Sequence, residues 1–434
     1  MRRPSEGPSM PDYTHAPEPL GVPTRRAAIR LLDAVLRRGE ALEAALPAAT
    51  RAIHGPDRGL AHAIAAETLR RLPDLDALID SATKTNLPDD AKARMALRIA
   101  LVQTLVLGTP SHAAIATVLP LVDGGPRKLV HGVFGTLFRA GVLLPEVPTL
   151  PAPVELRWEA AWGEEMVDAA RVAIAVPPPL DLTIADPSET EGWREKLGGV
   201  SFMPGHLRLG EHASVPDMDG FSDGAWWVQD IAASLPARLL GQGAGHVLDL
   251  CAAPGGKSLQ LAAAGWTVTS VDNSQSRIKR LRENLFRTHL KAEVVNADIL
   301  DWQPAEPADA VLIDAPCSAT GIFRRHPDVL HRVRPSIIAE TAALQARIFA
   351  RAADWVKPGG TLVYATCSLE LSEGEAQLDA FLAARSDYSV VPVAQSELPE
   401  GIAPTEQGTV RTLPGMLAEQ GGADGFFMVR LKRS

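Results

Sequence analysis

Residues 246–258 read HVLDLCAAPGGKS, an apolar stretch that leads into a Gly-rich turn. This order is typical of a strand, a tight turn and a helix in an α/β domain. Gly255 and Gly256 let the backbone approach a ligand, and the N-terminus of the following helix favours a negative group. A Walker A loop would need a glycine where Cys251 stands, and the GxGxxG spacing is also absent. The stretch predicts a ligand loop without a diphosphate; the alternative is a turn that only connects two elements.

Short apolar stretches and helical patterns alternate after this point. Strands are expected at His246–Leu250, Thr267–Asp272, Glu293–Asn296, Ala310–Asp314 and Thr361–Thr366, with helices after the first, second and fourth. This alternation is typical of a doubly wound parallel sheet, so we predict a Rossmann-like domain over residues 236–434. Tyr388–Val393 and Phe426–Leu431 have no helical pattern between them. We expect them to close the sheet edge as an antiparallel hairpin.

The rest of the chain has a different character. At roughly 150 residues per domain, 434 residues predict about three domains. The proline-containing residues 1–23 predict a flexible tail, residues 24–145 an all-helical domain with Thr24 as its first N-cap, and residues 146–235 a small connecting α+β segment. Residues 24–145 hold 16 Lys and Arg against 11 Asp and Glu, a net charge of +5 within a chain of net charge −9. The overall acidity therefore does not exclude a nucleic-acid partner.

Composition excludes several classes of protein. Hydrophobic residues make up 46% and charged residues 22%, as in globular proteins. No apolar run is long enough to cross a membrane, and the N-terminus lacks the apolar segment of a secretory signal, so we expect a cytoplasmic protein. The three cysteines form no CxxC pair, which fits neither a metal site nor a disulfide scaffold.

Acidic residues end the second and third strands. Asp272 stands where α/β folds place a carboxylate on ribose hydroxyls, and Asp298 could reach an adenine edge, although alone it would more often be a turn residue. An adenosine ligand without a diphosphate fits this pattern. We therefore expect S-adenosylmethionine as the bound methyl donor.

Two of the cysteines follow neighbouring strands. Cys317 and Cys367 come after the fourth and fifth strands, whose carboxyl ends share one edge of the sheet, so both thiols should face one cleft. Buried apolar thiols are the alternative, and a reducing compartment argues against a disulfide between them. A thiolate that adds to carbon 6 of a pyrimidine activates carbon 5 for methylation. Asp314 could hydrogen-bond the ring and stabilise the developing charge. The residues alone leave open which thiol is the nucleophile.

Five segments in order resemble the Sun family of RNA cytosine-5 methyltransferases: DLCAAPGGK (249–257), VDNSQSRIKRLREN (271–284), NAD (296–298), DAPCSATGIFRRHPD (314–328) and YATCS (364–368). The helical domain resembles the antitermination factor NusB through residues 24–39, 67–79 and 126–141. The resemblance implies a class I S-adenosylmethionine methyltransferase fold, with Cys367 as nucleophile, Cys317 assisting product release and Asp314 at the reacting end. The cofactor contacts that it implies are Cys251, Ala252, Ala253, Pro254, Gly255, Gly256, Lys257, Asp272, Asp298 and Asp314.

The expected activity is therefore methylation of one cytosine in 16S rRNA, free or in a partly assembled small ribosomal subunit, by a protein without a metal or a membrane partner. The same chemistry on tRNA or another rRNA cytosine, and a non-catalytic NusB-like RNA-binding protein, are the alternatives. Arg324, Arg325, Arg332 and Arg334 lie near the Cys317 loop and would suit phosphates at the cleft mouth, or form a solvated basic face.

Overall fold

The computed structural model describes residues 19–210 and 214–434, and the chain divides into two compact units between Pro145 and Glu146. Most of the tail predicted for residues 1–23 lies outside the described residues. Segment 146–235 packs within the same unit as the C-terminal sheet. Each unit is considered by itself.

The N-terminal unit is helical. Its helices are α1 (Val22–Arg38), α2 (Leu42–Ala49), α3 (Pro56–Arg70), α4 (Leu72–Ser81), α5 (Lys92–Leu105), α6 (Ser111–Val118) and α7 (Gly124–Arg139). Helix α5 is buried from Ala93 to Gln103 and is the centre around which the others pack. Its buried Arg98 forms a bidentate ion pair with Asp76 of α4, with both distances at 2.7 Å.

The start of this unit differs from the sequence prediction. Gly21 is the N-cap of α1, so the prediction of Thr24 as N-cap was wrong. Pro23 lies in the first turn, where its fixed φ suits a helix and its missing N–H costs nothing. The Thr24 hydroxyl instead donates to Asp57 of α3 (2.9 Å).

The second unit holds both helices and strands. Its helices are α8 (Ala152–Trp162), α9 (Glu164–Ala175), α10 (Thr190–Leu197), α11 (Ile231–Arg238), α12 (Gly256–Ala263), α13 (Gln275–Thr288), α14 (Val329–Arg332), α15 (Pro335–Ala353) and α16 (Glu375–Ala384). Its strands are β1 (Leu180–Ile184), β2 (His206–Leu209), β3 (Trp226–Val228), β4 (His246–Leu250), β5 (Thr267–Asp272), β6 (Glu293–Asn296), β7 (Ala308–Asp314), β8 (Val356–Thr366), β9 (Tyr388–Val390), β10 (Val410–Thr412) and β11 (Phe426–Arg433).

The large sheet has the strand order β10-β11-β8-β7-β4-β5-β6. Strands β4 to β8 are parallel, and β11 pairs antiparallel with β8. The predicted Rossmann-like fold is confirmed. Strand β9 also pairs antiparallel with β11, but β10 intervenes in the chain, so the two do not form a simple hairpin.

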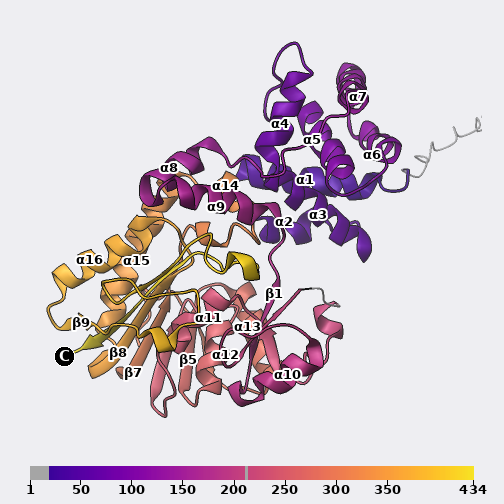
Figure 1. The fold of residues 1–434 in the computed structure, drawn as a ribbon. Coiled ribbons are helices and arrows are strands. Elements are labelled where there is room, and N and C mark those ends of the chain that lie inside the picture. Colours follow the sequence, from indigo (N-terminus) through magenta and orange to yellow (C-terminus); the bar gives the residue numbers. More distant parts are fainter. Residues whose placement is uncertain (1–18, 211–213) are drawn as a thin grey trace, which may run out of the picture. The chain divides into compact units, whose positions relative to one another are not determined.

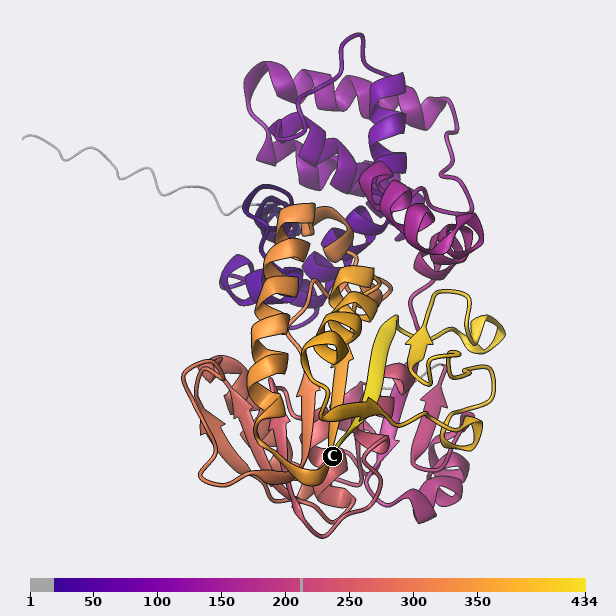
Figure 2. The same cartoon turned by 90° about the vertical axis from the view of Figure 1, so that its left-hand side faces the viewer.

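Helices cover both faces of this sheet (Figures 1 and 2). Helices α15 and α16 pack on one face through Phe349 and Phe381, whose stacked rings are 4.0 Å apart between centroids. Helices α11 and α12 pack on the other face through Leu235 and Leu261. With both faces covered, ligands have access at the carboxyl ends of the strands.

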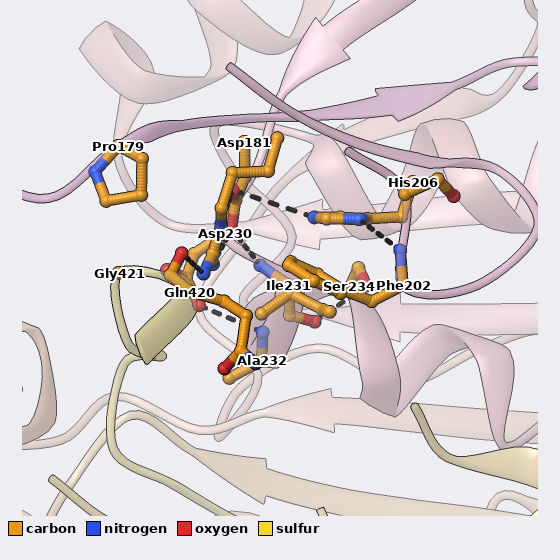
Figure 3. A network of polar contacts seen from close by, with 12 residues as sticks. Pro179, Asp181, Phe202, His206, Asp230, Ile231, Ala232, Ser234, Gln420 and Gly421 are labelled. Carbon is orange, nitrogen blue, oxygen red and sulfur yellow. Dashed lines mark hydrogen bonds and ion pairs between the residues drawn. The ribbon is translucent and has the colours of Figure 1, made fainter. Parts of the chain in front are cut away.

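A buried ion network joins the small sheet β2-β1-β3 to the large one (Figure 3). Asp181 of β1 is fully buried and accepts a bidentate pair of hydrogen bonds from Arg208 of β2 (2.6 and 2.7 Å). It also accepts the Ile231 N–H at the start of α11 (3.0 Å). Burial alone would raise the pKa of Asp181, but the hydrogen bonds from Arg208 and the nearby His206, whose Nε2 is 3.6 Å away, lower it below its usual range. The carboxylate therefore stays charged and connects β1, β2 and the start of α11.

Arg324 and Arg325, expected at phosphates, belong to this network. Arg324 is 3% exposed and lies between the Asp424 and Asp230 carboxylates (3.0 and 3.3 Å), while Arg325 reaches Asp230 at 3.0 Å. The prediction that Arg324 binds phosphate at the cleft mouth was wrong, because this side chain is buried. Of the four arginines, Arg334 is the exposed one.

Within the described residues, none of the helices is sufficiently long and apolar to span a membrane.

Replacing Asp181 tests the buried network. Asp181→Asn leaves the Arg208 charge buried without its partner, so we expect a loss of about 3–5 kcal/mol in the free energy of unfolding, measured by urea denaturation at pH 7. The matched control is Asp219→Asn, which breaks an exposed 3.6 Å pair with Lys196 and should cost less than about 1 kcal/mol.

The pH dependence of this loss has a defined sign. Because folding lowers the pKa of Asp181, its stabilisation is present above the unfolded value of about 3.9 and disappears as the pH falls below it. The difference between wild type and Asp181→Asn should shrink below about pH 4. Equal losses for Asp181→Asn and Asp219→Asn at pH 7 would contradict the account.

Candidate active site

A cavity of about 490 Å³ lies at the carboxyl ends of the parallel strands. Its volume is in the range of about 300–1,000 Å³ that small-molecule sites occupy. Six of the residues singled out in the sequence line it together: Cys251, Asp272, Asp298, Asp314, Cys317 and Cys367. Ala253 and Pro254 line it as well. Residues more than a hundred positions apart in the chain therefore meet in one site.

Other residues of the ligand loop lie elsewhere. Ala252, Gly256 and Lys257 line a second cavity of about 360 Å³, which shares Pro254 and Asp314 with the first. Gly255 is not among the residues that line either cavity. It caps α12 at φ 106°, and a Cβ there would approach Leu281 of α13 to 3.0 Å. Glycine is thus required at this position for two reasons: the positive φ and the close packing against α13.

Asp272 holds the ligand loop in place. Its carboxylate accepts the N–H groups of Ala253 (3.1 Å) and Ser274 (2.8 Å) and pairs with Arg277 (2.5 Å). A carboxylate has about four acceptor positions, so one remains for a ligand. Asp298 is more exposed, and one of its oxygens accepts the Leu300 N–H (2.8 Å).

Lys257 forms an ion pair with Asp314. The distance from its Nζ to the Asp314 carboxylate is 2.7 Å, and Lys257 is buried. Burial alone would lower the pKa of Lys257, but the neighbouring Asp314 carboxylate outweighs burial and raises it. The charge of a Cys367 thiolate also raises this pKa. The ammonium group therefore stays charged between a carboxylate and a thiol.

The Cys317 and Cys367 sulfur atoms are 3.4 Å apart. Contact with the Cys367 sulfur, followed by burial and the nearby Glu373, raises the pKa of the Cys317 thiol well above its ordinary value. Cys317 therefore remains protonated at neutral pH and can donate its S–H to Cys367. The third thiol, Cys251, also has a raised pKa, chiefly because it is buried.

The loops that carry the two thiols are stacked closely. The Gly321 N–H donates to the Cys367 carbonyl (3.0 Å), and the Gly425 N–H donates to the Gly321 carbonyl (2.8 Å). A Cβ on Gly321 would lie 1.9 Å from the Gly425 oxygen, so the approach requires glycine. The segment before β11 therefore helps to position both cysteines.

Glu373 is a site residue that sequence reasoning missed. It is fully buried and accepts both the N–H (2.9 Å) and the hydroxyl (2.5 Å) of Ser318, the residue after Cys317. It also accepts a hydrogen bond from Thr341 of α15. It lies outside the motifs, and only its position in the fold reveals its role in holding the Cys317 loop.

Helix α8 holds the other thiol loop. The Trp162 indole N–H donates to the Leu369 carbonyl (2.8 Å), and the Trp158 indole N–H donates to Glu370 (3.2 Å). Arg157 pairs with the same Glu370 carboxylate (2.8 Å). The chain just after Cys367 is therefore fixed by a helix that precedes the large sheet by about 80 residues.

Comparison with protein families gives two matches. A model described as 16S rRNA methyltransferase RsmB/F matches residues 238–432, and a NusB family model matches residues 22–129. Ribosomal RNA small subunit methyltransferase B of Xylella fastidiosa is 36% identical to this chain and covers 95% of it and 98% of that protein. The protein of the same name from Pseudomonas syringae is 33% identical and covers 94% and 96%.

Two solved structures resemble the whole or part of the chain. The crystal structure of PH0851 superposes with a TM-score of 0.73 at 21% identity, covering 95% of this chain and 99% of that one. The structure of NSun6 from Pyrococcus horikoshii with SFG has a TM-score of 0.57 at 17% identity and covers 65% and 98%. At these identities the likeness is one of fold.

Alkylation of the thiols tests whether Cys367 raises the pKa of Cys317. Cys367→Ala removes the largest cause of the raised pKa of Cys317, so Cys317 should react with iodoacetamide faster at pH 8.5 than in the wild type. Peptide mass spectrometry measures each thiol separately. Cys251 is the internal control, because Cys367 is not among the causes of its raised pKa. Unchanged or slower alkylation of Cys317 would contradict the account.

Proposed function

This chain belongs to the RsmB/F family of 16S rRNA methyltransferases, and from that premise we propose that it methylates carbon 5 of one cytosine in 16S rRNA through a covalent adduct with Cys367. The observation that carries the proposal is the pair of thiols 3.4 Å apart beside the Lys257–Asp314 ion pair. Methylation of oxygen or of an amino group needs no such nucleophile.

S-adenosylmethionine is the methyl donor, and it supplies an electrophilic methyl group on a positively charged sulfur. The residues of the 490 Å³ cavity fit this molecule. The remaining acceptor position of Asp272 suits a ribose hydroxyl, and Asp298 suits the adenine edge. The loop from Cys251 to Lys257 lies between these carboxylates and the thiols, where the reacting end of the donor belongs.

Cys367 is the proposed nucleophile. Its thiolate forms a bond to carbon 6 of the cytosine, and the electron pair of the 5,6 double bond makes carbon 5 nucleophilic. Carbon 5 takes the methyl group as the bond between that methyl and the donor's sulfonium sulfur breaks, and the donor leaves as a neutral thioether. Carbon 5 then loses its proton to a base. The 5,6 double bond re-forms as the bond between carbon 6 and sulfur breaks, which returns the Cys367 thiolate.

Neighbouring groups support this assignment. The protonated Cys317 lies 3.4 Å from the Cys367 sulfur and can donate its S–H to that sulfur when it leaves the ring. Asp314 can accept hydrogen bonds from the cytosine amino group, and its 2.7 Å ion pair with Lys257 holds the carboxylate in place. Cys317 then assists release of the product.

The substrate must present an unpaired or flipped cytosine, because a base within a duplex cannot reach the cavity. We propose that the basic NusB-like unit binds structured rRNA, either free or in a partly assembled small subunit. This binding would take place in the cytoplasm. The names of the relatives favour 16S rRNA over tRNA or another rRNA.

Replacement of each thiol tests the mechanism. Cys367→Ala should abolish methyl transfer from labelled S-adenosylmethionine to unmodified 16S rRNA, because it removes the proposed nucleophile. Cys317→Ala should accumulate a covalent complex between protein and RNA, seen as a band of reduced mobility on a denaturing gel. Cys251→Ala is the control and should give no such band. An active Cys367→Ala variant would refute the mechanism.

A further inference from the structure

The proposed reaction assigns no ligand to the second cavity of about 360 Å³, although Lys257 and Asp314, which take part in that reaction, are among the residues that line it. Three parts of the chain line this cavity: β3 with its flanking residues, the ligand loop, and α13. The cavity shares Pro254 and Asp314 with the first cavity. Anything that enters it is therefore next to the cytosine that the proposed mechanism places at Asp314.

One wall of this cavity is apolar and aromatic. Phe221, Trp227 and Val228 line this wall. Val228 is the last residue of β3, and it is 47% exposed whereas the two tryptophans before it are buried. The guanidinium group of Arg287 lies 4.2 Å from the centre of the Phe221 ring. Flat apolar surfaces of this kind, combined with arginine, are those on which nucleobases stack.

Within residues 19–210 and 214–434, no carboxylate forms an ion pair with Arg287. Its Nη1 donates to two neutral groups, the carbonyls of Phe221 (2.8 Å) and Trp226 (3.0 Å). Burial lowers the pKa of Arg287. An anion at the cavity would compensate a half-buried positive charge, and a phosphate is the natural ligand of a guanidinium group.

The face of α13 that borders the cavities is polar and mainly basic. Arg277, Arg280, Asn284 and Arg287 follow one another at spacings of three and four residues, which places them on one face of the helix. Arg277 lines the first cavity, while Asn284 and Arg287 line the second. The exposed Arg280 lies between them in the stripe. A strand of RNA can follow this face by its phosphates.

From these observations we infer that the second cavity binds the nucleotide next to the target cytosine, with its base against Phe221 and Val228 and its phosphate at Arg287. Asn284 donates to the Pro254 carbonyl (3.2 Å) and its side-chain oxygen is available to a donor on the edge of that base. The inference rests on the proposed function, because it takes RNA as the substrate. It adds a specificity site that reads the neighbour of the methylated base.

An abasic nucleotide tests the inference on the full chain. Wild-type protein first methylates a 16S rRNA transcript, and bisulfite sequencing locates the modified cytosine. Short RNAs around it then carry an abasic nucleotide on the 5′ or the 3′ side. One of the two should lower kcat/KM by about tenfold or more, because it removes the stacked base.

Val228→Trp fills the cavity without removing a polar contact. It should lower kcat/KM on the intact RNA by about tenfold, but it should cause no further loss on the sensitive abasic RNA. Asn284→Ala is a second variant. It should lower kcat/KM on the intact RNA by less than Val228→Trp does, and it should also cause no further loss on the sensitive abasic RNA. Val200→Trp is the matched control, since Val200 is 50% exposed in the same segment and lies outside both cavities.

The outcomes separate the two proposals. Equal losses from Val228→Trp on intact and abasic RNA, or no loss at either abasic position, would overturn the assignment of the cavity while leaving the methylation intact. Absence of any methylated cytosine with the wild-type protein would instead refute the proposed function. Binding of S-adenosylmethionine, measured by calorimetry, should be the same in wild type, Val228→Trp and Val200→Trp.

Discussion

The site depends on the pairing of β7 with β8. Because these parallel strands are neighbours, the loops that follow them must begin side by side at the carboxyl edge of the sheet, and the Cys317 and Cys367 sulfur atoms come to 3.4 Å. At this distance the Cys367 sulfur raises the pKa of the Cys317 thiol. Burial and the nearby Glu373 raise the pKa of Cys317 further.

The surroundings of the site explain why its loops keep their positions. Glu373 fixes the chain after Cys317, and α8 fixes the chain after Cys367 through two tryptophans. The buried network around Asp181 and Asp230 joins the β2-β1-β3 sheet to the same region. The segment before the large sheet is thus part of the structure that holds the active site, and it supplies one wall of the second cavity.

Local patterns predicted the strands and the shared cleft well. The apolar runs that end in Asp272, Asp314 and Thr366 are strands, because short runs between turn signals leave few alternatives in an alternating α/β chain. The family resemblance and the fold are confirmed by the matches to both family models and to near full-length relatives. The pairing of Cys317 with Cys367 in one cavity also follows from strand adjacency.

The sequence could not reveal contacts between distant polar residues. Nothing local distinguishes Arg324, which is buried between two aspartates, from the exposed Arg334, and nothing marks Glu373 as the partner of Ser318. Such partners are set by tertiary packing. Packing also explains why residue 255 must be glycine, since a Cβ there would come within 3.0 Å of Leu281, a contact that the motif does not suggest.

The most direct test of the central claim is a map of 5-methylcytosine in the rRNA and tRNA of a strain that lacks this gene. The account predicts that one cytosine of 16S rRNA loses its methyl group, that a plasmid with the wild-type gene restores it, and that the Cys367→Ala gene does not. Unchanged 16S rRNA, with the loss in a tRNA or in another rRNA, would contradict the account.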